Sequence, residues 1–383
     1  MKIVASCGWL LVLACFNLSL CAADLVFQPS NPPEMKPLTN HNSPAHLAAK
    51  QFRRGVNLGD YLEASWNSGI SFSPEDFARI KAQGFDHIRV PVGWHQYAGA
   101  GPGFELKPEI FGKVDFVVTN ALANKLAVLI NIHHFNDFDR DPAGSTEKFI
   151  AIWRQVAAHY RIQPNPLAFE LINEPHDAAT TAAINPIYPK VIAEIRKSNP
   201  GRTIFVEPGN WGNIPELKNL VLPPDDNLIV SVHCYEPFFF THQGASWAGA
   251  DAMVTGYQFP GPPVQPLVPD PALEIKPHVR DLIAKYNTLP TENNPISAQA
   301  FKENLQYARA WSDHYGRPVH IGEFGCYIRA DAESRIRYYT QFRRTAEELK
   351  LGWAMWDWSA NFRYWDPQKN QPVAGMRDAL FGK

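Results

Sequence analysis

Two glutamates stand in sequence contexts where a carboxyl group could do chemistry. Glu174 follows an apolar run and Asn173, whereas Glu323 has small neighbours on both sides in the stretch 321–325. Cleavage of a glycosidic acetal needs one acid to protonate the leaving oxygen and one carboxylate to attack the sugar or activate water. The pair therefore favours glycoside hydrolysis if the fold brings the two carboxyl groups together. Their separation, which distinguishes retention from inversion, has to come from the structure.

Polar and aromatic side chains also end other apolar runs of the chain. These residues are Asn57, Arg89, His133, His134, His233, Tyr235 and Trp356. His233 and Tyr235 are two positions apart and share one face of a strand, while Cys234 points to the opposite face. An inward histidine and tyrosine can donate hydrogen bonds to a carboxylate and hold it ionised.

Eight short apolar runs alternate with amphipathic stretches along the chain. We expect strands at 54–58, 87–91, 127–133, 168–174, 203–207, 228–235, 319–324 and 352–358. We expect helices after Ser73 and up to Gly84, and at 108–124, 146–160, 188–198, 297–314 and 332–350. This alternation predicts an α/β fold, the (β/α)8 TIM barrel, whose working residues lie at the C-terminal ends of the strands. A doubly wound open sheet is the alternative, but no glycine-rich phosphate turn follows the first strand.

Three other glutamates have similar contexts. Glu170 shares strand parity with Glu174, so it should point into the barrel at a deeper level, where a structural ion pair is expected. Glu207 and Glu236 each precede a proline. We rank these two lower because neither has a preceding amide partner or an equally well placed opposite carboxylate.

Composition restricts the class of protein. The chain has 383 residues, 45% of them hydrophobic and 12% aromatic, which permits a large core and excludes a disordered chain. Lys and Arg number 36 against 38 Asp and Glu, a net charge of −2, so there is no electrostatic reason to expect nucleic acid or an anionic membrane as partner. A neutral substrate is expected.

We expect three segments in one chain. Residues 1–23 read as a secretory signal peptide, because Lys2 precedes an apolar stretch that ends at Ala22 and Ala23. An uncleaved anchor helix and a lipoprotein anchor at Cys21 remain alternatives. Residues 24–50 are proline-rich and should be extended, and 51–383 should form a single catalytic barrel domain. The prediction is a secreted or periplasmic monomer that needs no metal or cofactor.

Few cysteines remain after cleavage at Ala23. Only Cys234 and Cys326 are left, which excludes a disulfide scaffold. The two could pair with each other or remain as buried thiols.

The stretch 260–271 is rich in proline. We expect it to be a surface excursion near the active face of the barrel.

Taken in order, the motifs resemble those of glycoside hydrolase family 5, the cellulase family, over residues 53–359. The matching segments are 54–59, 87–91, 131–134, 171–175, 233–235, 321–325 and 353–358. The resemblance implies a retaining mechanism with Glu174 as acid and then base, and Glu323 as nucleophile. It also implies that Asn173 binds the sugar 2-hydroxyl and that Arg89 and Tyr235 orient Glu323.

The remaining implied roles concern the walls of the sugar site. His133 and His233 should line the subsite of the reacting sugar, with His134 beside them, and Trp356 should stack under the ring. Further tryptophans that could stack on a pyranose are Trp66, Trp94, Trp211 and Trp247. Trp153, Trp311 and Trp353 are expected in the core. The run 238–240 of three phenylalanines could roof the cleft or anchor a buried loop.

The predicted activity is that of an endo-β-glucanase that hydrolyses β-1,4 linkages of cellulose-type or mixed-linkage β-glucan. Mannan and β-1,3-glucan present similar stacking faces, so an endo-β-mannanase, a β-1,3-glucanase or a transglycosylase on the same scaffold are alternatives. A non-catalytic carbohydrate-binding protein should lack one of the two glutamates. A metal-dependent barrel hydrolase should carry a His-x-His in the first strand, and 54–59 has none.

Overall fold

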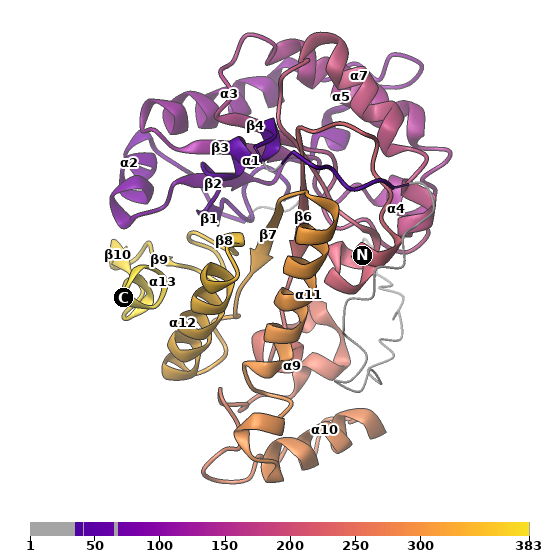
Figure 1. Cartoon of the computed structure of the whole chain (residues 1–383). Coiled ribbons are helices and arrows are strands. Elements are labelled where there is room, and N and C mark those ends of the chain that lie inside the picture. Colours follow the sequence, from indigo (N-terminus) through magenta and orange to yellow (C-terminus); the bar gives the residue numbers. More distant parts are fainter. Residues whose placement is uncertain (1–34, 41, 65–67, 383) are drawn as a thin grey trace, which may run out of the picture.

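Eight parallel strands close into a barrel (Figure 1). The computed structural model describes residues 35–40, 42–64 and 68–382. The strands are β1(Arg54–Asn57), β2(His87–Val90), β3(Ala127–Asn131), β4(Leu167–Glu170), β5(Ile204–Val206), β6(Leu228–His233), β7(Val319–Phe324) and β8(Gly352–Met355). Each strand pairs with its neighbour in the sequence, and β1 pairs with β8 to close the ring. The expected (β/α)8 barrel is confirmed.

Long helices form the outer layer around the strands (Figure 1). They are α2(Pro74–Gln83), α3(Pro108–Ala123), α5(Thr146–His159), α7(Tyr188–Ser198), α11(Gln299–Tyr315) and α12(Ala332–Glu348). The other helices and turns are α1(Pro44–Ala49), α4(Asn136–Arg140), α6(Thr181–Ile184), α8(Gly209–Gly212), α9(Phe238–Thr241), α10(Pro277–Thr288), α13(Met376–Phe381), η2(Trp94–Tyr97), η3(Ile214–Asn219), η4(Ser246–Ala248), η5(Ala250–Met253) and η6(Thr291–Asn293). A two-stranded ribbon, β9(Trp365–Asp366) and β10(Gln371–Pro372), lies near the C-terminus.

Local sequence signals explain the ends of α2. The backbone N–H of Ser73 donates a 2.8 Å hydrogen bond to Oδ2 of Asp76, as in a capping box, and Pro74 occupies the first helical position. Gly84 ends the helix with a φ of 114°. The helix therefore begins and ends where its capping residues predict.

The inside of the barrel changes from apolar to polar along the strands. At the N-terminal end, Phe52, Leu129 and Phe205 belong to a buried apolar cluster that α1 helps to cover. Two residues further along their strands, the inward positions are polar, as at Asn131 and Glu207. The larger core lies between strands and helices and includes Trp153, Trp311 and Trp353, all fully buried as expected. The polar end of the barrel is thus the place where chemistry can occur.

Three expectations about elements need correction. The segment 24–50 is not extended throughout, because Ser43 caps the short helix α1, its side chain accepting a hydrogen bond from the backbone N–H of His46. Helix α10 follows the proline-rich stretch and was not predicted. Several strands are shorter than expected, and β4 ends at Glu170. The predicted signal peptide lies outside the described residues.

The connection between β6 and β7 is the longest excursion from the barrel. It contains α9 and α10, and α10 projects beyond the ring of barrel helices (Figure 1). Val264 and Val268 in its proline-rich part are 90% and 82% exposed, which agrees with the expected surface position. Among the described residues, no helix is both long enough and apolar enough to cross a bilayer.

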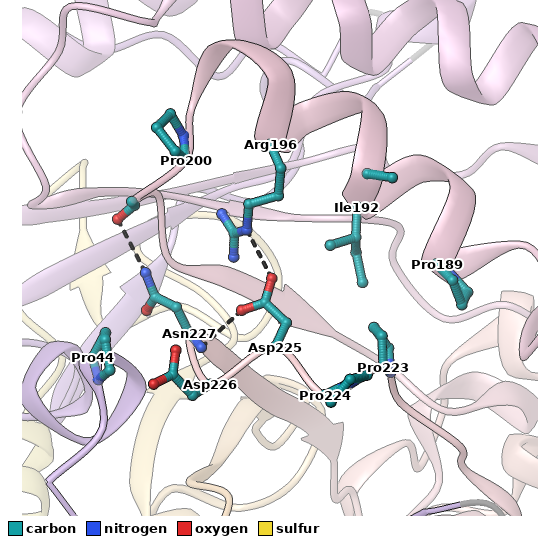
Figure 2. Close-up of a pocket in the computed structure, with 12 residues that line it drawn as sticks. Pro44, Pro189, Ile192, Arg196, Pro200, Pro223, Pro224, Asp225, Asp226 and Asn227 are labelled. Atoms are coloured by element: carbon teal, nitrogen blue, oxygen red, sulfur yellow. Dashed lines mark hydrogen bonds and ion pairs between the residues drawn. The ribbon is translucent and has the colours of Figure 1, made fainter.

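A surface hollow of about 550 Å³ lies at the N-terminal ends of β5 and β6 (Figure 2). Prolines form much of its wall, and the ion pair between Arg196 and Asp225, with Nε and Oδ2 2.7 Å apart, crosses it. Asn227 closes one side by donating a 3.0 Å hydrogen bond to the carbonyl of Gly201. This hollow lies at the opposite end of the barrel from Glu174 and Glu323.

Candidate active site

The structure brings Glu174 and Glu323 together at the C-terminal end of the barrel. Glu323 lies within β7, and Glu174 lies in the loop after β4. One carboxyl oxygen of each glutamate and a ring nitrogen of His233 lie within 4.8 Å of one another. Two residues distant in the sequence therefore present their carboxyl groups to the same small volume.

Each carboxyl oxygen of Glu323 accepts a hydrogen bond. Nη1 of Arg89 donates to Oε1 at 2.6 Å, and the hydroxyl of Tyr235 donates to Oε2 at 2.7 Å. Burial raises the pKa of Glu323, and the positive charges of His233 and Arg89 together with the Tyr235 hydroxyl oppose this rise. Because the guanidinium of Arg89 is positively charged and can only donate, its contact with Oε1 favours the carboxylate form of Glu323.

Glu174 is held differently and is more open to solvent. Its side chain is 24% exposed against 5% for Glu323, and its Oε1 lies 2.7 Å from Nδ1 of His233. Burial acts to raise the pKa of Glu174, but the hydrogen bond and charge of His233 bring it below its usual value. Glu207 and Glu323 in turn raise the pKa of His233 well above its usual value, against the effect of burial. The two shifts favour a Glu174 carboxylate beside a protonated His233, so the proton of this contact lies on the imidazole and can pass to Glu174.

The backbone around Glu174 has a left-handed conformation that the expected strand 168–174 would not allow. The φ of Glu174 is 46°, a backbone conformation that residues other than glycine rarely adopt unless their surroundings impose it. The backbone N–H of Glu174 donates to Oε2 of Glu207 at 2.9 Å, and its carbonyl oxygen lies 2.7 Å from Nδ1 of His176. These contacts turn the side chain toward Glu323.

Arg89 is the centre of a buried network beneath the two glutamates. Its guanidinium is fully buried and donates to Oε2 of Glu170 at 2.6 Å, to Oδ1 of Asn57 at 2.9 Å and to Oδ1 of Asn173 at 2.7 Å. The surrounding carboxylates raise the pKa of Arg89 despite its burial. Glu170 thus forms the structural ion pair that its parity indicated. Because Oδ1 of Asn173 accepts from Arg89, its amide NH2 is the donor side.

His133 and Trp356 form a wall of stacked rings. Their ring centroids are 5.7 Å apart at an interplanar angle of 14°, and His134 packs edge-on against His133 at 4.3 Å. Burial lowers the pKa of both histidines, which keeps them neutral. Gly59 allows the close approach of Trp356, since a Cβ at this position would lie 2.7 Å from the indole. The indole of Trp356 is partly exposed and can meet a sugar ring.

The other tryptophans divide into platforms and core. Trp211 stacks on His176 with centroids 4.9 Å apart at 16°, and Trp247 is 47% exposed, so both can offer a face to a sugar. The expectation for Trp94 is wrong: its side chain is fully buried and packs against Phe111, with 5.3 Å between centroids. An indole that solvent cannot reach cannot stack on a sugar. Trp66 lies outside the described residues.

Glu207 belongs to the site although its sequence context ranked it low. It is fully buried, accepts the Glu174 N–H, and lies 3.3 Å from both Nε2 of His233 and Nη2 of Arg89. Burial raises the pKa of Glu207 to about 7. Its position directly after β5 is the signal that could have identified it. Glu236 instead accepts a 3.4 Å contact from the thiol of Cys234, away from the pair.

The remaining expectations around the site are resolved by packing. Cys234 and Cys326 are both free and buried, so they do not form a disulfide. Phe239 and Phe240 are buried and anchor α9, whereas Phe238 stacks on His242 at 4.4 Å. That histidine packs edge-on against Tyr235, so the phenylalanine run supports the residue that donates to Glu323.

Glu174, His233 and Glu323 have the composition of a metal-ligand set. Their atoms are already engaged, because Arg89 and Tyr235 bind the two oxygens of Glu323 and Nδ1 of His233 contacts Glu174. A cation in this space would face the Arg89 guanidinium at close range. We therefore assign no metal or cofactor site to these residues.

Two carboxyl groups face each other at the mouth of the barrel. Arg89 and Tyr235 bind one of them, and His233 contacts the other. This arrangement places the protein among the glycoside hydrolases. The chain belongs to the cellulase family, glycosyl hydrolase family 5, whose family model matches residues 53–362.

Curated relatives and solved structures agree with this membership. Endoglucanase H of Acetivibrio thermocellus is 28% identical over 79% of this chain, but the match spans only 29% of that longer protein. Endoglucanase C of the same organism is 27% identical over 80% of this chain and 91% of its own length. The endoglucanase Cel5A of Thermotoga maritima, in its structure with cellobiose, superposes with a TM-score of 0.75 at 31% identity over 88% of this chain and 99% of that chain. The same enzyme has been solved with mannotriose.

Proposed function

We propose that this protein is a secreted endo-β-1,4-glucanase that acts with retention of configuration on cellulose-type or mixed-linkage β-glucan. The observation that carries the proposal is the pair of carboxyl oxygens of Glu174 and Glu323, which lie within 4.8 Å of each other. Retaining glycosidases hold their carboxyl groups about 5 to 5.5 Å apart, and inverting ones about 6.5 to 9.5 Å, to leave room for a water molecule. The short separation supports retention.

In the first step, a carboxylate oxygen of Glu323 attacks the anomeric carbon while the proton shared by His233 and Glu174 passes through Oε1 to the leaving oxygen. The C–O bond to the leaving sugar breaks, and an ester bond joins the remaining sugar to Glu323. Arg89 and Tyr235 hold the attacking group in place. The amide NH2 of Asn173 is placed to donate to the 2-hydroxyl.

In the second step, Glu174 takes a proton from a water molecule that attacks the same carbon, and the ester bond breaks to return Glu323 as a carboxylate. The greater exposure of Glu174 suits this role because water has to reach it. No metal or other cofactor enters this mechanism. Transglycosylation follows the same steps with a sugar hydroxyl in place of water.

The β-1,4-glucan preference is supported by the relatives, which are named endoglucanases, and by the neighbour solved with cellobiose. Stacking of pyranose faces on Trp356 and Trp211 is compatible with several β-linked glycans. The mannotriose complex of the same neighbour makes β-mannan the second candidate substrate. Export from the cell rests on the sequence of residues 1–23, and we propose that the exported enzyme acts as a monomer.

The test is the release of reducing sugar from carboxymethyl-cellulose, barley β-glucan, laminarin and mannan. We expect the first two to be cleaved fastest, with an early loss of viscosity that marks endo cleavage. The Glu323→Gln variant should lose at least ~10³-fold of the activity. NMR of the first-formed anomer should show the β form. Faster cleavage of mannan would replace the substrate assignment, and an α product would overturn retention.

A further inference from the structure

We propose that Glu207 is a positioning residue that keeps the acid/base group Glu174 supplied with its proton, by fixing the protonation of His233 and the backbone of Glu174. The proposal rests on the proposed acid/base role of Glu174. The resemblance to the cellulase family gives Glu207 no role.

The first observation is that Glu207 contacts both Glu174 and His233. Oε2 accepts the backbone N–H of Glu174 at 2.9 Å, and Oε1 lies 3.3 Å from Nε2 of His233. The other ring nitrogen, Nδ1, lies 2.7 Å from Oε1 of Glu174. Glu207, His233 and Glu174 therefore form a chain from a fully buried carboxyl group to the one that meets the substrate.

The contact between Oε1 of Glu207 and Nε2 of His233 also determines which ring nitrogen of His233 carries a proton. A carboxylate beside Nε2 favours a proton on that nitrogen, as a buried carboxylate does for the imidazole of other catalytic pairs. With Nε2 kept protonated by Glu207, the proton on Nδ1 can pass to Oε1 of Glu174 and leave a neutral imidazole. Without Glu207, a neutral His233 could carry its only proton on Nδ1 and could not give that proton up, so Glu174 would stay a carboxylate that cannot act as an acid.

The third observation is that this contact is buried, since the side chains of His233 and Glu207 are 2% and 0% exposed. Gly212 has a φ of 65°, and a Cβ at this position would lie 2.8 Å from Oε2 of Glu207. Tyr188 of α7 donates a 2.8 Å hydrogen bond to the backbone carbonyl of Glu207. In these dry surroundings the charge of Glu207 acts strongly on the imidazole.

Other ionisable groups also act on these three side chains, and they set the direction of the expected pH effect. Those that act on Glu207, His233 or Glu174 are Arg89 of β2, His133 and His134 after β3, Asp139 of α4, Glu170 of β4, Tyr188 of α7, Tyr235 and His242 after β6, and His320 and Glu323 of β7. All of them remain in a Glu207→Gln variant. Loss of the Glu207 charge alone makes the shared proton easier to remove, so the pKa that ends activity at high pH should fall.

The experiment compares full-length wild type with Glu207→Gln on barley β-glucan and on 2,4-dinitrophenyl β-cellobioside. Glutamine keeps the shape and can still accept the Glu174 N–H. On β-glucan, we expect kcat/KM to fall about 10- to 100-fold, part of the 10²- to 10⁴-fold that a general acid contributes. The alkaline limb of the pH profile should move about one unit lower. On the dinitrophenyl substrate, whose leaving group needs no proton, kcat/KM should change little.

The matched control is Glu236→Gln, which alters another glutamate that precedes a proline but lies away from the pair. It should leave both substrates and the pH profile unchanged. Equal losses on the two substrates with an unmoved alkaline limb would show that Glu207 is merely structural and would overturn the inference. If the wild type cleaved neither substrate, the proposed function itself would fail. That result differs from a failure of the Glu207 inference, in which the wild type is active.

A second measurement decides the matter if Glu207→Gln does not fold. Wild-type protein labelled with ¹⁵N-histidine, with the His233 signals identified by their loss in His233→Gln, reports the protonation of each ring nitrogen. We expect a proton on Nε2 of His233 at pH 8, where Glu207 is ionised because this pH lies above its pKa of about 7. A bare Nε2 beside Glu207 at that pH would contradict the proposed role.

Discussion

The hydroxyl of Tyr235 donates a 2.7 Å hydrogen bond to Oε2 of Glu323, opposite the 2.6 Å hydrogen bond from Arg89 to Oε1. The two contacts restrain both the rotation and the charge of the carboxyl group. A nucleophile that has to be ionised and correctly oriented before the substrate arrives gains from both restraints.

Tyr235→Phe removes one of these donors without changing the shape of the ring. A hydrogen bond to a charged group contributes about 1.5 to 3 kcal/mol, so we expect kcat/KM to fall roughly 10- to 150-fold. The carboxylate loses a stabilising donor, so the pKa of Glu323 should rise and the acidic limb of the pH profile should move to higher pH. Kinetics across pH 4 to 8 measure both effects. Tyr315→Phe on α11 is the control, and an unmoved acidic limb would contradict the role of Tyr235.

Arg89→Met should destabilise the fold as well as abolish activity. Removing one partner from a buried charge network costs about 3 to 5 kcal/mol, because the remaining carboxylates lose their compensation. Arg89 opposes burial and lowers the pKa of Glu170, so this stability is present above the unfolded pKa and is lost as pH falls. The difference from wild type in urea unfolding should therefore be largest near pH 7 and shrink toward pH 4. A difference that did not depend on pH would argue against charge compensation.

Trp356 and Trp94 should separate substrate binding from stability. Trp356→Ala removes a partly exposed stacking surface, so we expect a roughly tenfold loss in kcat/KM with little change in thermal stability. Trp94→Ala leaves a cavity in a fully buried site and should cost about 3 to 5 kcal/mol of unfolding free energy. Activity assays at 25 °C together with denaturation curves distinguish the two. The opposite pattern would show that Trp94 contacts the substrate and that Trp356 belongs to the core.

Strand periodicity was sufficient to predict the barrel and most of the inward polar positions. Arg89, His233 and Glu323 lie within or at the ends of strands, where alternation predicts the direction of a side chain. Glu170 follows the same rule, and its ion pair with Arg89 lies where parity places it. These assignments need only local pattern and the general geometry of parallel barrels.

The rest depends on tertiary contacts that no local pattern encodes. Glu174 turns toward the site because its left-handed backbone after β4 is held by Glu207 and His176. Glu207 lacks a distinctive sequence neighbour, and its importance arises from contacts with residues of three other strands or loops. Trp94 has the composition of a sugar platform, but packing against Phe111 of α3 buries it.

The central claim is that Glu323 forms a covalent bond with the sugar. Incubation with 2,4-dinitrophenyl 2-deoxy-2-fluoro-β-cellobioside should release one equivalent of dinitrophenolate and leave a fluorosugar on the protein, because the fluorine slows hydrolysis of the ester. Peptide mass mapping should place the adduct on Glu323. An adduct on Glu174 or Glu207, or turnover of β-glucan by an enzyme that this reagent never labels, would contradict the account.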